Sequence, residues 1–199
     1  MDERQQRDLL ERLLIHPPIA SVLHRLQMYD RTTWEHSLRT ARLTIVLGIL
    51  YGLRGEDLWQ LGCGGVLHDI GKLWVSREIL NSTGPLTDRE YRIIQLHPVS
   101  GAWYLNYLGG FSDTVLALVE QHHVNCDGTG YPQVGRVHPW TGLLRTADSY
   151  DAMVSRRSYQ HGKTPEEALL DLQAHAQTWY DADAVRCIER WIGNKGGYL

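Results

Sequence analysis

The amino-acid sequence predicts an all-α domain, and three observations lead to this prediction. Apolar residues recur every three or four positions along much of the chain, which is the spacing of one face of a helix. The segments Thr87–Glu90 and Thr164–Glu167 both fit the reciprocal capping box that starts many helices. Segments that alternate between apolar and polar residues, as half-buried strands do, are essentially missing from the sequence.

Two short helices are predicted at the N-terminus, on either side of Pro17 and Pro18. Proline fits the first turn of a helix but breaks its interior, so these two residues separate the helices. The two helices either close the rest of the chain into one core or provide the interface of a homodimer, and the sequence does not decide between these roles. Their apolar faces comprise Leu9, Leu10, Leu13, Leu14, Ile19, Val22, Leu23 and Leu26.

The remaining helices are predicted from caps and apolar spacing. The third begins with Thr32 or Thr33 as its cap, and the fourth ends at His68. Two long loops that contain glycine and proline interrupt the helices, one after Lys72 and one at Asn125–Pro139, and such loops are often functional. Glycines at 62, 64 and 65 indicate close packing of the fourth helix. Besides the helices that follow the two capping boxes, the predicted ranges are about 33–51, 56–68, 112–123, 140–153 and 183–191.

Composition indicates a soluble domain with no general attraction to nucleic acid. The 199 residues are 43% hydrophobic and 22% charged, and the net charge is -3. The N-terminus lacks the features of a signal peptide, and no apolar run approaches membrane-spanning length. Three cysteines, Cys63, Cys126 and Cys187, are too few and too scattered for a disulfide framework, so a reducing cytoplasm fits best. We therefore expect neither a nucleic-acid polymer nor a membrane among the partners.

Two adjacent pairs of polar residues stand out among the ten histidines. His68-Asp69 ends one apolar helix, and His122-His123 ends another just before a glycine-rich loop; such pairs are costly to bury without partners. Neutral imidazole and carboxylate together suit iron, manganese or zinc, and the two oxygens of Asp69 would allow it to bridge two ions. The alternative is helix capping, because His favours a helix C-terminus and Asp accepts local backbone hydrogen bonds. Capping accounts for one pair but hardly for all.

Four segments, taken together and in this order, resemble a known family. They are HDIGK at 68–72, HPVSG at 97–101, HHVNCDGTGYP at 122–132 and ADSYDAMVSRRSY at 147–159. The pattern resembles the HD-GYP subgroup of the HD phosphohydrolases, and the resemblance runs from about Thr33 to Val185. It implies an HD-domain helical bundle with two additional short N-terminal helices. We interpret the chain as a single domain over residues 1–199, with a helical extension at 1–30 and a catalytic core at 31–185.

The resemblance also implies a site for two metal ions, with iron or manganese as the most suitable metals. Some family members hold a third ion through a Glu one helical turn before the first histidine, where this chain has Thr32. Glu35 is no substitute, because an adjacent helical residue points about 100° away around the axis. By resemblance one ion is held by His36, His68, Asp69 and Asp148, and the second by Asp69, His97, His122 and His123.

The reaction of the family is implied in the same way. Its members hydrolyse cyclic dinucleotides, above all cyclic di-GMP, to pGpG and sometimes further to GMP, and a hydroxide that bridges the metals fits such a reaction. Asp69 and Lys72 are the expected catalytic residues, because a lysine beside the metals can neutralise charge on the phosphate. The expected substrate contacts are Lys72, Asp151, Arg157, Tyr159 and Tyr131.

Two other functions and one protein partner stay open at this point. Di-iron oxygenases of the HD superfamily, similar to myo-inositol oxygenase, use an almost identical ligand set, although the GYP loop argues against this reaction. The other alternative is a weakly active or inactive signalling module that binds a nucleotide or a partner. The GYP loop itself, Gly128–Pro132, either shapes the mouth of the substrate site or contacts a diguanylate cyclase (GGDEF) domain, as is thought for family members.

Several residues depart from the usual family pattern. Ser76, Ser82 and Thr83 replace a proline, a lysine and a proline, and Ser158 replaces another proline. Val124 replaces a Glu and cannot orient a metal ligand as a carboxylate would. Because none of these changes removes a metal ligand, we expect an intact metal site and leave room for an unusual substrate or a different turnover.

Overall fold

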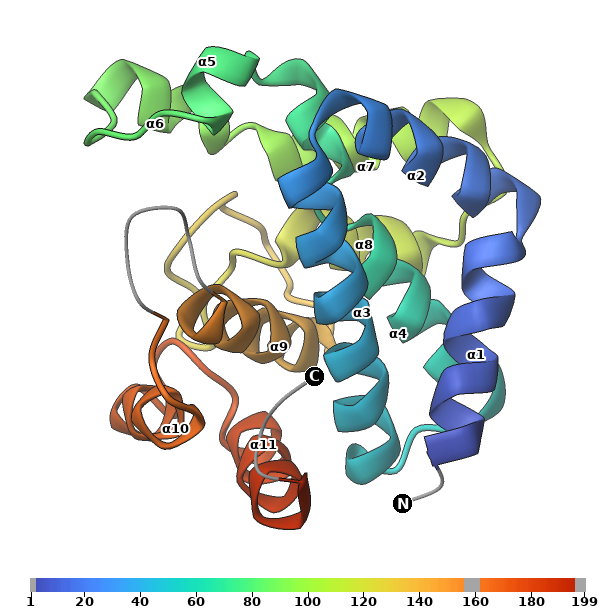
Figure 1. The fold of residues 1–199 in the computed structure, drawn as a ribbon, viewed down its shortest axis with the longest axis vertical. Coiled ribbons are helices and arrows are strands. Elements are labelled where there is room, and N and C mark those ends of the chain that lie inside the picture. The colour runs from blue at the N-terminus through green and yellow to red at the C-terminus, as the bar shows by residue number, and fades with distance from the viewer. Residues whose placement is uncertain (1–2, 156–161, 196–199) are drawn as a thin grey trace.

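A computed structural model describes residues 3–155 and 162–195, which form helices joined by turns and loops (Figure 1). The predicted all-α class is confirmed, since the extended pairings within these ranges are two isolated bridges, at Val124 with Gly130 and Ala176 with Tyr180. No helix in the described part is both long and apolar enough to cross a bilayer. The elements are α1 (Glu3–Ile15), α2 (Pro17–Tyr29), α3 (Arg31–Tyr51), α4 (Gly55–Leu67), η1 (Ile70–Trp74), α5 (Arg77–Leu80), α6 (Asp88–Ile94), α7 (His97–Leu108), α8 (Asp113–Gln121), α9 (Thr141–Val154), α10 (Pro165–Ala174) and α11 (Ala182–Lys195).

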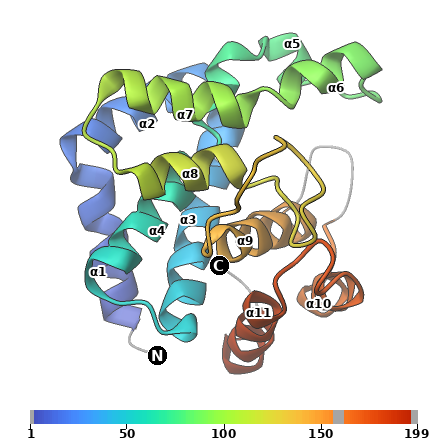
Figure 2. The same cartoon turned by 180° about the vertical axis from the view of Figure 1, so that it is seen from behind.

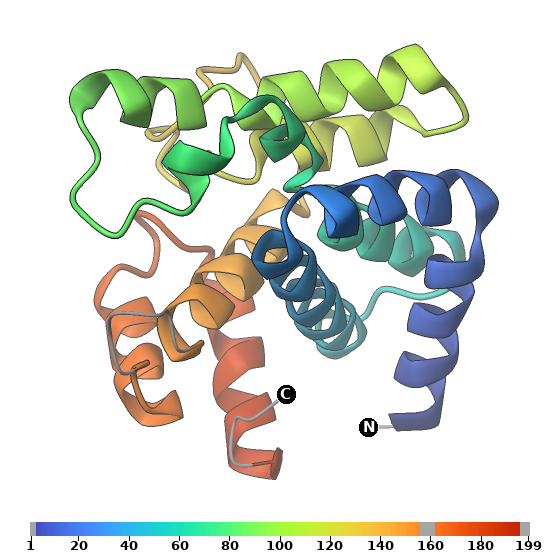
Figure 3. The same cartoon turned by 45° about the horizontal axis from the view of Figure 1, so that its top comes forward.

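The two N-terminal helices, α1 and α2, belong to the core of the molecule (Figures 1 and 3). Leu13, Ile19 and Leu26 are buried in the same hydrophobic cluster as Ala41 of α3 and Leu67 of α4. The two prolines between the helices occupy the first turn of α2, where a missing backbone N–H costs little. The apolar faces of α1 and α2 therefore help to close the core, which is the first of the two roles that the sequence left open.

The start of α3 differs from the prediction. Asp30, rather than Thr32 or Thr33, caps this helix, and its Oδ1 accepts a hydrogen bond from the backbone N–H of Thr33 at 2.7 Å. A carboxylate at this position satisfies a backbone donor and also favours the helix dipole, so the helix begins at Arg31. At its other end α3 stops at Gly52, whose φ of 110° lies in the left-handed region.

Glycines on α4 allow this helix to approach two neighbours closely. A Cβ atom on Gly65 would lie 3.0 Å from the Cα of Ala41 in α3, and one on Gly64 would lie 2.9 Å from the side chain of Leu118 in α8. The close packing predicted for this helix is thus confirmed. It holds the C-terminal end of α4 between α3 and α8, where His68 lies.

The middle of the chain contains more helix than predicted. The loop expected after Lys72 includes the end of η1 and the short α5, and α7 has no counterpart among the predicted helices. The sequence of α7 opens with His97-Pro98 and contains Gly101, so its intrinsic helix propensity is low. Tertiary packing decides instead, because Gly101 lies against Gly71 of η1, whose backbone N is 3.1 Å from an ideal Cβ at Gly101.

The C-terminal helices α9, α10 and α11 form a second hydrophobic cluster on another side of α3 (Figures 2 and 3). Leu47 of α3, Leu144 of α9 and Ile188 of α11 are fully buried in it. The capping boxes at Thr87–Glu90 and Thr164–Glu167 are both confirmed, at the starts of α6 and α10. Helix α3 therefore lies between two half-cores, and the seam between them holds the candidate site described next.

Candidate metal centre

Helix ends and helix centres from both half-cores bring the predicted ligands together. The C-terminal ends of α4 and α8 meet the N-terminal end of α7, the second turn of α3 and the middle of α9. The side chains form two groups, and within each group the potential ligand atoms all lie within 4.8 Å of one another. One group is His36, His68 and Asp69, and the other is His97, His122 and His123. The positions are His36 on α3, His68 and Asp69 at the end of α4, His97 at the start of α7, His122 and His123 at the end of α8, and Asp148 on α9.

Asp69 stands between the two groups and turns one oxygen to each. Its Oδ2 lies 3.4 Å from Nε2 of His68 and 3.8 Å from Nε2 of His36, whereas its Oδ1 lies 3.2 Å from Nε2 of His97. Asp148 Oδ1 completes the first group at 2.9 Å from Nε2 of His36 and 3.7 Å from Nε2 of His68. This geometry is what a carboxylate that bridges two ions would need.

Backbone carbonyls fix the protonation of three histidines. In each of them, Nδ1 lies close to the backbone carbonyl oxygen of the residue three positions earlier. The distance is 2.9 Å for His68, 2.7 Å for His97 and 2.7 Å for His122. Each Nδ1 must carry the proton to donate to that oxygen, so in the neutral ring each Nε2 carries a lone pair. Nε2 of His97 and Nε2 of His122 nevertheless face each other at 3.1 Å, and Nε2 of His68 is buried without a hydrogen-bond partner. Buried lone pairs arranged in this way fit a metal cation.

The electrostatics of the site favour the ligand forms of most of its residues. Burial lowers the pKa of His122 well below its ordinary value and that of His123 to about 3, so both rings are neutral at pH 7. Burial alone would raise the pKa of Asp69 and Asp148, but Lys72 beside the first and His36 beside the second hold both carboxyls well below their usual range. Neutral imidazoles and ionised carboxylates are the forms that bind metals.

His36 is the exception, and it leads to a pH-dependent prediction. Burial lowers its pKa, yet hydrogen bonds to Asp148 and Asp151 outweigh this and raise the pKa to about 9. A metal at Nε2 must therefore displace a proton, so affinity at the His36 group should fall by up to about tenfold for each pH unit below 9. Calorimetric Mn(II) titrations at pH 6, 7 and 8, in buffers of different ionisation enthalpy, should show proton release from His36 on filling that group. Mn(II) binding at the His36 group without release of a proton would contradict this prediction.

Asp151 takes a different place from the one expected. It is fully buried, its Oδ2 lies 2.7 Å from Nδ1 of His36, and Arg39 donates to Oδ1 at 2.8 Å and to Oδ2 at 3.0 Å. A carboxylate that holds the far nitrogen of a ligand histidine orients the ring, so this geometry favours a positioning role over contact with a base. Arg39 was missed from sequence, although it follows His36 by one turn and Asp151 follows Asp148 by one turn.

Lys72 and Tyr131 flank the candidate centre. Lys72 donates to Asp69 Oδ2 at 2.6 Å, and 22% of its side chain is exposed. The ring of Tyr131 stacks on that of His123 with a centroid distance of 4.7 Å. The other two predicted substrate contacts, Arg157 and Tyr159, lie outside the described residues, as does Ser158.

Residues 19–184 match a protein-family model described as HD domain. The chain belongs to the HD-domain family. The segments HDIGK, HPVSG and HHVNCDGTGYP, whose histidines and Asp69 meet in the site, further identify it as a member of the HD-GYP subgroup, as the sequence predicted.

Relatives of this HD-GYP chain include cyclic-dinucleotide phosphodiesterases. It is 33% identical over 202 residues to a cyclic di-GMP phosphodiesterase of Pseudomonas aeruginosa. The alignment covers 98% of this chain and 45% of that protein. It is 31% identical to a cyclic di-GMP phosphodiesterase of Thermotoga maritima, over 84% of this chain and 47% of that protein. It is 30% identical to 3'3'-cGAMP-specific phosphodiesterase 3 of Vibrio cholerae, over 79% of this chain and 35% of that protein. The chain thus spans less than half the length of these relatives.

Solved structures agree with the fold. An HDGYP protein from Bdellovibrio bacteriovorus matches with a TM-score of 0.68 and 16% identity, over 95% of this chain and 69% of that one. The HD domain of the Listeria monocytogenes phosphodiesterase PgpH, in complex with cyclic-di-AMP, matches with a TM-score of 0.66 and 18% identity, over 90% of this chain and 99% of that one. At these identities the likeness concerns the HD-domain fold.

The departures from the HD-GYP pattern at positions 76, 82, 83 and 124 lie outside the two groups of candidate ligands. Val124 is buried, and the residues at 76, 82 and 83 are exposed. Thr32 is also exposed, and the Glu35 carboxylate accepts from Arg31 at 2.8 Å instead of facing the histidines. Neither Thr32 nor Glu35 belongs to the two groups of candidate ligands.

Proposed function

We propose that this chain is a metal-dependent phosphodiesterase that hydrolyses a cyclic dinucleotide, with cyclic di-GMP as the first candidate and 3'3'-cGAMP as the second. The observation that carries the proposal is the set of buried, opposed Nε2 lone pairs around Asp69, which offers each of its oxygens to one histidine group. The names of the relatives from Pseudomonas, Thermotoga and Vibrio support this substrate class.

The proposed ligand set is that given by the sequence: His36, His68, Asp69 and Asp148 for one ion, and Asp69, His97, His122 and His123 for the other. Mixed nitrogen and oxygen donors suit iron or manganese, and we propose two ions because neither Thr32 nor Glu35 supplies a further ligand. Two bound ions would polarise the phosphodiester and lower the pKa of a water molecule at the site.

The protein's own residues have three tasks in this proposal. The carbonyl-anchored rings hold their Nε2 atoms toward one point, and Asp151 with Arg39 fixes the ring of His36. Lys72, which already lies beside a carboxylate oxygen, places a positive charge where the phosphate would lie. Burial excludes bulk water from five of the proposed ligands, which strengthens their interactions: His68, Asp69, His97, His122 and Asp148.

The proposal is tested by turnover of a cyclic-dinucleotide panel together with metal analysis. Without oxygen and with Mn(II) or Fe(II), we expect hydrolysis of cyclic di-GMP or 3'3'-cGAMP by protein that contains about two ions per chain. Activity should disappear in His68→Ala and persist in His24→Ala, which changes an exposed histidine of α2. Activity that requires oxygen would favour an oxygenase, bound metal without turnover would favour a binding module, and three ions per chain would refute the two-ion assignment.

The organisation and partners of the protein are further parts of this proposal. We propose a single domain that includes the extension at 1–30 and the core at 31–185, because α1 and α2 share the first hydrophobic cluster with α3 and α4. A diguanylate cyclase domain remains the proposed partner of the GYP loop, and residues 128–130 of this loop are exposed. A homodimer remains a prediction that size measurements would test.

A further inference from the structure

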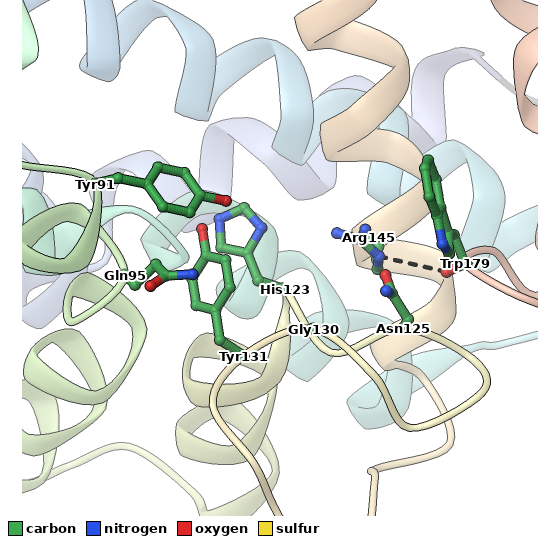
Figure 4. Close-up of a pocket in the computed structure, with 8 residues that line it drawn as sticks. All are labelled: Tyr91, Gln95, His123, Asn125, Gly130, Tyr131, Arg145 and Trp179. Atoms are coloured by element: carbon green, nitrogen blue, oxygen red, sulfur yellow. Dashed lines mark hydrogen bonds between the residues drawn. The ribbon is translucent and has the colours of Figure 1, made fainter. Parts of the chain in front are cut away.

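A pocket of about 450 Å³ lies beside the candidate metal centre (Figure 4). His123 forms part of its wall, so the pocket adjoins the second histidine group. Its volume falls within the range of about 300–1,000 Å³ that is typical of small-molecule sites. Most of its other wall residues belong to no motif that the sequence singled out, and they come from α6, α9 and the turn that precedes α11.

Three aromatic rings line this pocket and two of them are already held in place. Tyr131 stacks on His123, and Trp179 stacks on His175 with a centroid distance of 4.1 Å and an interplanar angle of 8°. Tyr91 of α6 is 50% exposed and Trp179 is 44% exposed. Rings held from one side and accessible from the other are suitable platforms for stacking of a nucleobase.

Arg145 of α9 supplies fixed donors to the same space. Its Nε donates to the carbonyl oxygen of Trp179 at 3.3 Å, and its guanidinium lies 5.6 Å from the ring centroid of Tyr180. These contacts tether the guanidinium to the Trp179 side of the pocket. In Figure 4 the terminal nitrogens of Arg145 point from the Trp179 side of the pocket toward His123.

Asn125 supplies an acceptor whose identity follows from its neighbours. Thr129 donates its hydroxyl proton to Asp127 at 2.6 Å, so its oxygen accepts from Nδ2 of Asn125 at 2.7 Å. The amide orientation is thereby fixed, and Oδ1 of Asn125, in a residue that is 8% exposed at the pocket wall, has no hydrogen-bond partner. An unsatisfied buried acceptor costs free energy that an N–H group of a ligand would recover.

We propose that this pocket is a nucleobase subsite that prefers guanine over adenine; this inference rests on the proposed cyclic-dinucleotide substrate. Guanine presents two adjacent acceptors, O6 and N7, which match the paired donors of an arginine, and its N1–H and amino groups match an acceptor such as Asn125 Oδ1. Adenine presents an amino donor in place of O6 and would oppose Arg145. The subsite accordingly accepts cyclic di-GMP and 3'3'-cGAMP, each of which carries a guanine, and disfavours cyclic di-AMP.

The subsite is tested by the ratio of GMP to AMP affinity in the metal-loaded protein, measured by calorimetry. Both ligands carry the same phosphate, so the ratio isolates the base. We expect GMP to bind about 10- to 100-fold more tightly than AMP, and this preference to shrink to about twofold in Arg145→Ala and in Arg145→Lys, which keeps the charge without the fork. Tyr91→Ala should weaken both ligands and keep the ratio. Arg186→Ala, on the exposed side of α11, should match the wild type.

The outcomes separate this inference from the proposed function. Loss of the guanine preference in Arg145→Ala supports the subsite even if no cyclic dinucleotide is hydrolysed. An unchanged ratio in Arg145→Ala overturns the subsite even if cyclic di-GMP is hydrolysed, and a full preference in Arg145→Lys overturns the paired-donor contact. If thermal unfolding and metal content show that Arg145→Ala does not fold, the GMP to AMP ratio of Arg145→Lys decides instead.

Discussion

Replacement of Asp69 by Asn is expected to lower kcat/KM by at least about 1,000-fold and to reduce the metal content below two ions per chain. Asn keeps the shape of Asp but loses the charge, and it offers one oxygen where the carboxylate offers Oδ2 to His36 and His68 and Oδ1 to His97. Lys72 loses its ionised partner at the same time. Activity on the preferred cyclic dinucleotide and metal content by mass spectrometry are the two readouts.

A matched control separates the site from the general effect of losing a carboxylate. Asp57→Asn changes an exposed residue in the first turn of α4, the helix that ends beside Asp69, and should leave activity and metal content unchanged. Thermal unfolding in the presence of a chelator shows whether the Asp69 variant folds. An Asp69→Asn protein that holds two ions and retains full turnover would exclude the bridging role.

Gly71→Ala is expected to destabilise the protein by about 3 kcal/mol or more and to displace His97. A Cβ on Gly71 would overlap the carbonyl oxygen of His97 and lie 2.7 Å from the backbone N of Gly101. These obstacles are backbone atoms, so no side-chain rotation relieves them, and η1 and α7 must separate. Urea unfolding of the metal-free and metal-loaded proteins would measure the loss, which should include weaker metal binding.

Gly84→Ala provides the comparison, because nothing lies within 4 Å of a Cβ at this exposed position. Its free energy of unfolding should lie within about 0.5 kcal/mol of the wild type. If Gly71→Ala unfolds at the same urea concentration as Gly84→Ala, the close approach of η1 and α7 is not a constraint in solution.

Most helices and the two capping boxes could be predicted because their signals are local. A hydroxyl and a carboxylate three residues apart are enough to mark a helix start, as at Thr87 and Thr164. The adjacent pairs His68-Asp69 and His122-His123 were equally visible, since unpartnered polar residues at the end of an apolar helix need an explanation. The fold then brings both pairs to one place, at the ends of α4 and α8.

What could not be predicted depends on residues far apart in the sequence. Helix α7 forms because Gly101 fits against Gly71, and no periodic pattern reports such a contact. The contacts of Asp151 with His36 and Arg39 join residues more than 100 positions apart, so no local pattern predicts them. Arg145 meets the turn at Trp179 across 34 positions, so this side of the pocket wall belongs to no sequence motif.

The opposed nitrogens of His97 and His122 have a consequence for the lifetime of the protein. Two lone pairs 3.1 Å apart in a buried setting repel each other, so the metal-free chain carries an electrostatic penalty that a cation removes. Ligands that bind only the folded state shift the folding equilibrium in its favour. Since the ligands come from both half-cores, bound metal is expected to slow unfolding of the whole fold and therefore to slow its proteolysis, which limited proteolysis with and without a chelator would measure.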